Sequence, residues 1–226
     1  MVDDSILEIA CFSTSAAIVA ANSGADRVEF CTDYRAGGCS PHPDEVISVS
    51  NELTIPIVVM VRLRPGNFLY SRQEVEAMRN YISALNNSAI EGFVLGAITS
   101  DKTPDYDALA KFKDAAGNKE LIFHRAFDSL KDSAGELKEL HNAGISRILS
   151  SGGPGNASDH KETLQSIFNA APKGLTIMPG GGIRPATIDE LRPSIPAKEW
   201  HSSAITNNNH LPDRDLIRLM KNILHS

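Results

Sequence analysis

Residues 22–28 read NSGADRV, and residues 142–148 read NAGISRI. Both stretches have one layout: the polar end of a helical pattern, then a glycine, then the start of an apolar, β-branched run. A glycine directly after a helix is a common C-terminal stop, so each stretch predicts a helix that leads into a strand. Because the same unit recurs in both halves of the chain, we expect a fold built by repeating one helix–strand step.

Eight short apolar or β-branched runs surround these units, and each is followed by a pattern with helical spacing. The predicted strands are 7–12, 27–31, 57–62, 92–98, 121–126, 147–151, 175–179 and 199–203, and the predicted helices are 14–23, 43–52, 71–86, 105–115, 130–142, 159–170, 185–193 and 213–224. Strict alternation requires parallel strands with right-handed crossovers, and eight such units can close into a barrel. An open dinucleotide-binding sheet is disfavoured, because residues 11–14 (CFST) carry no glycine-rich loop. The sequence therefore predicts an α/β fold, a single (β/α)8 TIM-like barrel domain over residues 1–226.

Composition narrows the classes of partner. The net charge is −6 and no run of Lys or Arg stands out, so we expect no nucleic-acid partner. No segment approaches the roughly 18 continuous apolar residues of a membrane span, and the acidic start differs from a signal peptide. Three cysteines in a chain of this size indicate free thiols in a cytoplasmic protein. Helix faces with exposed Leu or Ile would allow a homodimer.

Charged residues fall inside or at the ends of strands that should be buried on both faces. An unpaired charge there would be costly, so each needs a partner or a wet cavity. Barrel active sites lie at the carboxyl ends of the strands, and the candidate catalytic residues are Glu8, Glu29, Arg62, Arg64, His124 and Asp128. We expect the acids and arginines among them to neutralise one another. The alternative is a buried salt-bridge layer that only holds the barrel together.

Glycines and hydroxyl residues follow the last three strands. Loops after the seventh and eighth strands form the usual phosphate site of a barrel, because glycines let backbone N–H groups approach an anion. The predicted anion-binding residues are Ser151, Gly152, Gly180, Gly181, Gly182, His201, Ser202 and Ser203. A plain tight turn is the alternative for the glycines.

The cysteines form a third group of candidate residues. Cys31 and Cys39 are separated by a loop containing Gly37 and Gly38, while Cys11 follows the first strand on the face opposite to Glu8. Two thiolates can hold Cu(I), which prefers soft ligands. Buried, unreactive thiols are the commoner outcome.

Eight motifs together resemble the CutC family, described as copper homeostasis proteins. They are residues 7–9 (LEI), 24–31 (GADRVEFC), 37–41 (GGCSP), 62–71 (RLRPGNFLYS), 123–128 (FHRAFD), 149–152 (LSSG), 178–183 (MPGGGI) and 201–204 (HSSA). The resemblance implies a TIM-like barrel and Cu(I) bound by cysteines near the ends of the first two strands. Cys31 matches the second of these cysteines, whereas Ala10 stands at the first, so that Cys11 or Cys39 would have to supply the partner thiol. Asn67 stands where the family tends to have an acid.

Two hypotheses of function result. In the first, which the resemblance implies, Cys31 binds Cu(I) with Cys11 or Cys39 as a metal site for copper homeostasis. In the second, the protein is an enzyme acting on a small anionic or phosphorylated metabolite. There the charged strand ends would supply acid, base and substrate contacts, and the glycine loops would hold the anionic end. A barrel that binds without turnover is a third option.

Overall fold

The computed structural model describes residues 5–206 and 208–226. Its strands are β1 (Ile6–Cys11), β2 (Arg27–Phe30), β3 (Ile57–Met60), β4 (Gly92–Leu95), β5 (Glu120–Phe123), β6 (Ile145–Ser150), β7 (Thr176–Pro179) and β8 (Glu199–Ser202). Its α-helices are α1 (Thr14–Ala21), α2 (Pro43–Glu52), α3 (Arg72–Leu85), α4 (Tyr106–Ala116), α5 (Ser133–Asn142), α6 (Lys161–Ala170), α7 (Pro185–Leu191) and α8 (Arg214–Leu224). Three short 3-10 helices, η1 (Tyr34–Ala36), η2 (Arg125–Ser129) and η3 (Ala157–His160), lie in the connections.

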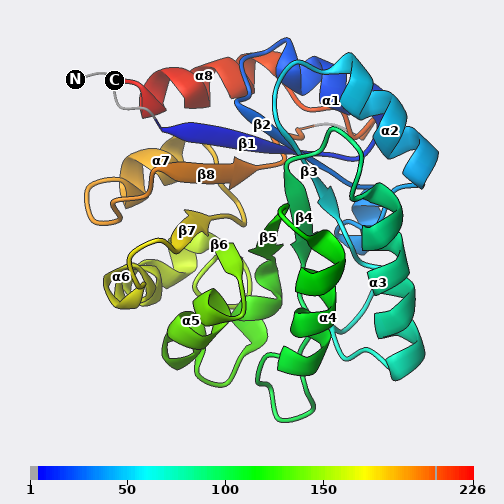
Figure 1. Cartoon of the computed structure of the whole chain (residues 1–226). Helices are drawn as coiled ribbons and strands as arrows, with labels where there is room; N and C mark the ends of the chain where they lie inside the picture. The colour runs from blue at the N-terminus through cyan, green and yellow to red at the C-terminus, as the bar shows by residue number, and fades with distance from the viewer. Residues whose placement is uncertain (1–4, 207) are drawn as a thin grey trace.

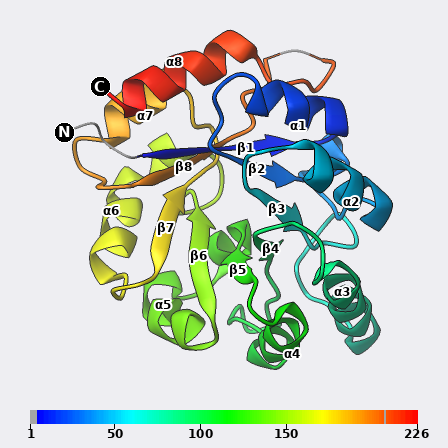
Figure 2. The same cartoon turned by 45° about the horizontal axis from the view of Figure 1, so that its top comes forward.

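The eight strands form one parallel sheet that curls into a nearly closed barrel. The ladder order is β7-β6-β5-β4-β3-β2-β1-β8, and within the described residues no ladder joins β7 to β8. The helices surround the ring of strands, as Figures 1 and 2 show. The predicted (β/α)8 barrel is confirmed. No helix of the described residues is long and apolar enough to cross a membrane.

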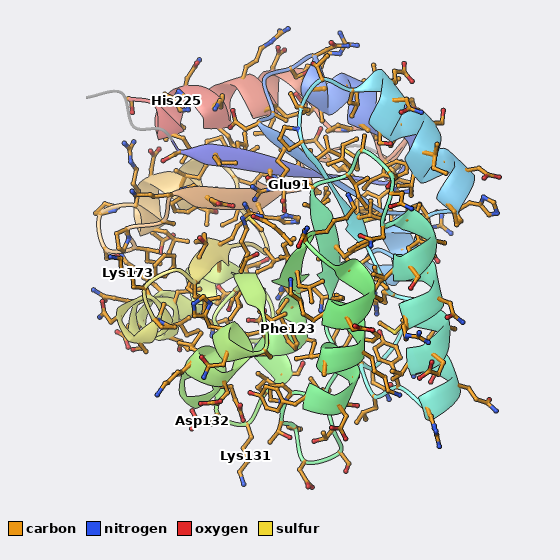
Figure 3. The ribbon with its side chains drawn as sticks, viewed as in Figure 1. Glu91, Phe123, Lys131, Asp132, Lys173 and His225 are labelled. Atoms are coloured by element: carbon orange, nitrogen blue, oxygen red, sulfur yellow. The ribbon has the colours of Figure 1, made fainter. Side chains whose placement is uncertain are left out.

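Local side-chain caps explain several helix starts. Ser71 and Glu74 form the predicted capping box at the start of α3, each side chain bonding the other's backbone N–H. Helix α5 begins three residues later than predicted. The reason is that the carboxylate of Asp132 (labelled in Figure 3) accepts a hydrogen bond from the N–H of Gly135 and so caps the helix.

Strand β5 ends earlier than the predicted range 121–126. His124 is extended, and its Nδ1 accepts a hydrogen bond from the N–H of Ala126 at 3.1 Å. That bond caps η2, so the chain leaves the sheet at Phe123 and turns over the end of the barrel. The early turn brings the imidazole of His124 to the mouth of the barrel.

Buried side chains lie in two layers, one on each side of the strands. The larger cluster fills the space between strands and helices and includes Cys11, Phe93 and Trp200. The smaller cluster lies on the inner face of β2 to β5 and consists of Cys31, Val58, Met60, Val94 and Ile122. Alternation along β1 and β2 thus separates Cys11 from Cys31, as the parity of the sequence predicts.

Candidate functional site

A cavity of about 250 Å³ opens at the carboxyl ends of the strands. That volume matches the liquid volume of about eight water molecules. Its walls are Ala10, Phe12, Glu29, Gly37, Met60, Arg62, Phe68, His124, Arg125, Leu149, Gly181, Gly182, Ile183, Arg184, His201, Ser202 and Ser203. The lining therefore combines residues from both ends of the chain, as expected for a barrel mouth.

A chain of ion pairs lies deeper in the barrel. The Nε of Arg27 is 2.5 Å from Glu8 Oε2, and its Nη2 pairs with Glu199. Arg147 then joins Glu199, at 2.9 Å, to Glu120. The prediction that Arg62 and Arg64 neutralise the strand acids is wrong, because Arg27 on the neighbouring strand is the counter-ion of Glu8. The charges of this network are paired, and Glu8, Arg27 and Glu199 are buried, so the network can hold the barrel together as the predicted salt-bridge layer would, with Arg27 in the place expected for Arg62.

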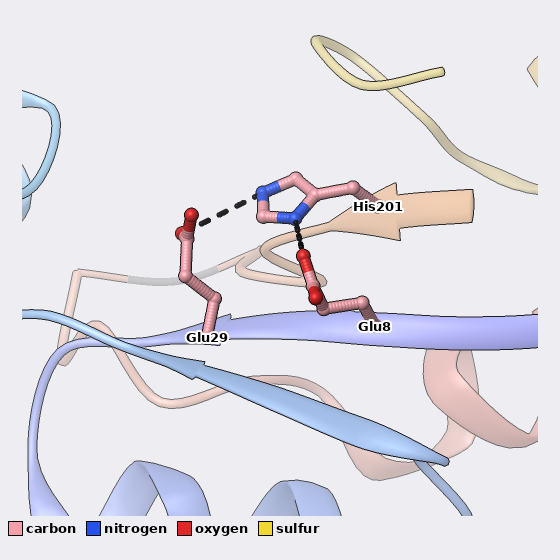
Figure 4. A group of neighbouring side chains, drawn as sticks. All are labelled: Glu8, Glu29 and His201. Atoms are coloured by element: carbon pink, nitrogen blue, oxygen red, sulfur yellow. Dashed lines mark hydrogen bonds and ion pairs between the residues drawn. The ribbon is translucent and has the colours of Figure 1, made fainter. Parts of the chain in front are cut away.

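His201 stands between the two acids, as Figure 4 shows. Its Nδ1–H donates to Glu8 Oε1 at 2.7 Å, and its Nε2 is 3.8 Å from Glu29 Oε2. Burial alone would raise the pKa of Glu8, but Arg27 and His201 outweigh it and hold the pKa at about 2. Burial would lower the pKa of His201, but the charges of Glu29 and Glu8 raise it above its ordinary value. An ionised Glu8 therefore holds a readily protonated imidazole at the cavity wall.

Glu29 is the carboxylate of the cavity wall. It is buried, which raises its pKa despite the nearby His201. The thiol of Cys31 donates to its Oε2 at 3.4 Å, whereas its Oε1 has no hydrogen-bond partner among the described residues. A carboxyl group in a cavity wall, with a raised pKa and one unpartnered oxygen, can act as an acid or a base.

Arg62 is a buried guanidinium held by backbone carbonyls. Its Nη1 donates to the oxygens of Ala36 and Gly38, and its Nη2 donates to that of Gly66, at 2.8 to 3.0 Å. Within the described part of the chain it has no carboxylate partner, and its Nε has no acceptor. The carbonyls orient the cation without cancelling its charge, so the charge remains available to an anion.

His124 lines the cavity with a neutral imidazole. Burial, together with the charge of Arg62, lowers the pKa of His124 to about 3. Because its Nδ1 accepts the N–H of Ala126, the proton of the neutral ring is on Nε2, and this Nε2 has no acceptor among the described residues. The ring also packs on Phe68, with 4.7 Å between the centroids.

Two more arginines, Arg125 and Arg184, and the glycine loop after β7 also line the cavity. Arg184 donates to Ser202 Oγ and to the carbonyls of Ile183 and Ile205, and it has no carboxylate partner in the described residues. Arg125 donates to Ser151 Oγ at 2.6 Å. The loop turns through positive φ, +89° at Gly181 and +72° at Gly182, which favours glycine.

The same loop offers backbone donors. Over residues 5–206 and 208–226, the N–H groups of Gly181 and Gly182 find no acceptor. A Cβ on Gly181 would come within 3.1 Å of Arg125 Nη1, and one on Gly182 within 2.6 Å of Asn156 Oδ1. Because glycine has no side chain at these two positions, the backbone N–H groups and the Arg125 guanidinium remain accessible as donors, which suits an anion.

Asp128 and Arg64 lie away from the cavity lining. Asp128 accepts from the hydroxyls of Ser150 and Ser151 and pairs with Arg125 at 3.0 Å, so it positions Arg125. Arg64 pairs with Glu74 and bonds its own loop. Among the predicted anion residues, Gly181, Gly182, His201, Ser202 and Ser203 line the cavity, whereas Ser151, Gly152 and Gly180 are not among the lining residues.

All three cysteines carry free, buried thiols. Burial, with the charge of Glu29, raises the pKa of Cys31 and of Cys11 well above the ordinary value. Burial also raises the pKa of Cys39. Cys11 faces the outer core and Cys31 the inside of the barrel, so the two thiols belong to different clusters.

Glu8, Glu29 and His201 offer three metal-ligating atoms within 4.8 Å of one another. The oxygens of Glu8, however, already accept from Arg27 and His201. Only Glu29 and His201 Nε2 are then available, fewer than the three protein ligands of typical catalytic zinc sites. The geometry suits proton transfer better than a resident metal.

Sequence reasoning missed Arg125, Arg184 and Phe68 as lining residues. Arg125 lies inside the run 123–128 and Arg184 directly follows the glycine loop, so their positions beside strand ends were a usable signal. Arg125 falls inside the predicted strand 121–126, but β5 ends at Phe123 and Arg125 lies in η2, so alternation along that strand does not apply to it. Arg184 lies outside every strand, and alternation gave no direction for its side chain.

The chain is similar in sequence to proteins of the CutC family. The sequence model of the CutC family matches residues 5–206. A Xanthomonas campestris pv. campestris protein named as a family protein CutC is 35% identical over 198 residues, which cover 88% of this chain and 82% of that protein. A relative of the same name from Rhizobium meliloti is 37% identical over 180 residues, covering 80% of this chain and 73% of its own length.

Two solved structures superpose well on this chain. The Streptococcus agalactiae protein provisionally described as copper homeostasis protein CutC superposes with a TM-score of 0.83 at 25% identity, covering 89% of this chain and all of its own. Phosphoribosyl anthranilate isomerase from Thermococcus kodakaraensis superposes with a TM-score of 0.65 at 16% identity, over 97% of this chain and 98% of its own. The second likeness shows the barrel fold alone.

Proposed function

The chain belongs to the CutC family, and we propose that it is an enzyme that binds a small anionic metabolite at the mouth of its barrel. The observation that carries this proposal is the charge of the cavity wall. Three guanidinium groups, Arg62, Arg125 and Arg184, line a cavity in which Glu29 is the only carboxylate among the lining residues. This local excess of positive charge stands against a net charge of −6 for the whole chain.

Two of these arginines have no carboxylate counter-ion in the described residues. Arg125 is paired with Asp128, but Arg62 and Arg184 bond backbone carbonyls and a hydroxyl. A guanidinium that is buried, as in Arg62, or half-buried, as in Arg184, is unfavourable without a counter-ion unless a ligand completes it. A phosphate or carboxylate would satisfy these guanidinium groups as well as the free N–H groups of Gly181 and Gly182.

Turnover is supported by the acid–base groups on the adjoining wall. Glu29 and His201 have raised pKa values that differ from the lowered value of Glu8. Groups whose pKa values are moved apart by burial and charge are typical of acid–base catalysis.

Titration calorimetry with inorganic phosphate and pyrophosphate tests the anion site. We expect binding by the wild type and a loss of at least about tenfold in affinity in Arg184→Gln and Arg125→Gln, because each charge-assisted hydrogen bond contributes about 1.5–3 kcal/mol. Arg218→Gln, on the exposed face of α8, is the matched control. If the cavity variants bind as tightly as the control, the anion site is wrong.

Copper binding by Cys31 is a second proposal, consistent with the description of the Streptococcus agalactiae relative. The observation that favours it is that Cys31 and Met60 pack in the same inner cluster: the position of a Cβ on Gly38 lies 3.5 Å from Cys31 Sγ and 3.7 Å from the Met60 methyl carbon. A thiolate with a thioether suits Cu(I). Competition with a Cu(I) chelator should show one ion bound, lost in Cys31→Ser and retained in Cys11→Ser. Equal binding by both variants would contradict a site at Cys31.

A further inference from the structure

Three unsatisfied polar atoms belong to residues that line the cavity. Six buried side-chain nitrogen or oxygen atoms of the described residues have no hydrogen-bond partner, and three of them, Glu29 Oε1, Arg62 Nε and His124 Nε2, belong to cavity-lining residues. Buried polar groups are normally satisfied, so a cluster of exceptions needs an explanation. One acceptor and two donors around one cavity indicate a ligand with complementary atoms.

The two donors lie beside the same aromatic ring. Phe68 packs on His124, and Arg62 Cζ is 5.1 Å from the centroid of the Phe68 ring. Arg62 is fixed by three carbonyls, and His124 is fixed by the N–H of Ala126. Both N–H groups are thus held in place before any ligand arrives, as in an oxyanion hole.

The acceptor is fixed as well. Oε2 of Glu29 receives the thiol of Cys31 and faces His201, which leaves Oε1 without a partner among the described residues. A single free carboxylate oxygen beside two preorganised N–H donors matches the needs of a carbon acid: a base for the C–H proton and donors for the oxygen on which charge develops.

Resting on the proposed function, we propose that the cavity catalyses proton transfer at the carbon next to a carbonyl group of the anionic metabolite. Glu29 Oε1 takes the proton, the electron pair of the C–H bond moves into the new C=C bond, and the carbonyl π pair moves onto oxygen. Arg62 Nε–H and His124 Nε2–H donate to that enolate oxygen. Return of the proton from Glu29 to the same carbon restores the compound. Its return to the former carbonyl carbon of a hydroxy ketone, with the hydroxyl proton passing to the enolate oxygen, gives the isomeric hydroxy carbonyl compound, so no co-reactant is consumed.

The substrate class follows from the rest of the wall. Gly181, Gly182, Arg125 and Arg184 supply donors for a phosphate or carboxylate. The cavity holds a compact molecule, of the size of a three- to five-carbon hydroxy ketone or 2-oxo acid. His124 is neutral over the physiological range, since burial and Arg62 keep its pKa at about 3. The neutral ring can therefore donate its Nε2–H to the enolate oxygen and remain an uncharged imidazole.

Solvent-isotope exchange tests this inference. Dihydroxyacetone phosphate, ribulose 5-phosphate and 2-oxobutyrate are incubated with the protein in D2O, and loss of the C–H signal beside the carbonyl is followed by proton NMR. We expect enzyme-dependent exchange for at least one compound. Glu29→Gln should lower the rate at least about 100-fold, as should His124→Ala, since losing one oxyanion donor costs about 10²–10³ in rate. The matched control is Glu45→Gln on the exposed surface of α2, which should exchange at the wild-type rate.

Phosphate binding, measured by calorimetry on the same samples, separates the two proposals. Phosphate binding without exchange of any of the three compounds overturns the proton-transfer inference and leaves the anion site intact. Absence of phosphate binding overturns the proposed function itself. Exchange by Glu29→Gln at the wild-type rate also overturns the inference. If Glu29→Gln fails to fold, Glu29→Asp, which withdraws the carboxylate by one methylene, should slow exchange at least about tenfold with phosphate affinity unchanged.

Discussion

Glu8 orients His201: the Nδ1–H of the imidazole donates to Glu8 Oε1 at 2.7 Å, although 193 positions separate the two residues. Strands β1 and β8 are neighbours in the barrel, and Glu8 lies opposite His201 in their register. With Nδ1 engaged, Nε2 faces Glu29 and the cavity. The contact between β1 and β8 therefore orients His201 toward Glu29 on β2.

Replacing Glu8 should change the titration of His201. The pKa of His201 is raised because the charge of Glu29 and the hydrogen bond and charge of Glu8 outweigh burial. In Glu8→Gln we expect this pKa to fall, since one carboxylate is lost while burial remains. NMR titration of the His201 ring measures the shift, with the exposed Glu52→Gln as control. An unchanged or higher pKa would contradict the assigned hydrogen bond.

Acid should destabilise the protein through Glu8. Its pKa is about 2 in the folded state against an ordinary 4.5, so its contribution is complete above pH 4.5 and is lost as pH falls toward 2. Urea unfolding at pH 7, 4.5 and 2.5 should show the free energy of unfolding falling by a few kcal/mol on the acid side. Glu8→Gln should be less stable at pH 7 and show a shallower decline. A decline as steep as in the wild type would assign the acid sensitivity to other groups.

Arg27 should be far more important for stability than an exposed arginine. Arg27→Met leaves the buried carboxylates of Glu8 and Glu199 without their shared partner, which we expect to cost about 3–5 kcal/mol. Arg218→Met, which breaks an exposed pair with Asp215, should cost less than about 1 kcal/mol. Urea unfolding at pH 7 compares the two, and similar losses would argue against a buried ion network.

The glycine loop gives a prediction with a close control. Gly181→Ala places a methyl group 3.1 Å from Arg125 Nη1 at a φ of +89°, so phosphate affinity should fall at least about tenfold. Gly24→Ala has comparable backbone strain, at a φ of +101°, but its nearest atom is Lys221 Cγ at 3.9 Å. It should lose stability and keep its affinity. Calorimetry with phosphate distinguishes the outcomes, and equal affinities in the two variants would show that the loop does not bind the anion.

Thiol labelling should follow burial. Cys11 and Cys31 are nearly inaccessible, at 0% and 1% exposure, and Cys39 reaches 8%. Since the thiolate is the reactive form and the pKa of each thiol is raised, iodoacetamide at pH 7.5 should label all three slowly, Cys39 first. Mass spectrometry during labelling gives the order, and urea should equalise the rates. Early labelling of Cys31 would show that the inner face of the barrel opens.

Much of the fold was predictable because its signals are local. The repeated unit at 22–28 and 142–148 and the eight apolar runs specify helix, stop and strand within a few residues each. Alternation along β1 and β2 likewise placed Cys11 on the outer face and Cys31 on the inner face. The candidate site was predictable to the extent that Glu29, Arg62, His124, His201 and the glycine loop lie at strand ends.

The register between neighbouring strands decided which charged side chains of the site are paired. Whether Glu8 meets Arg27 or Arg62 depends on the register between β1 and β2, which places Arg27 opposite Glu8 and leaves Arg62 beyond the end of β3. The free Nε2–H of His124 depends on one hydrogen bond in η2. The sequence by itself determined which polar side chains stand at or just beyond the strand ends, among them Glu29, Arg62, His124 and His201. Only the tertiary structure decided which of them neutralise one another and which remain unpaired, because partners in a barrel come from different strands, and the closing of the barrel sets their distances.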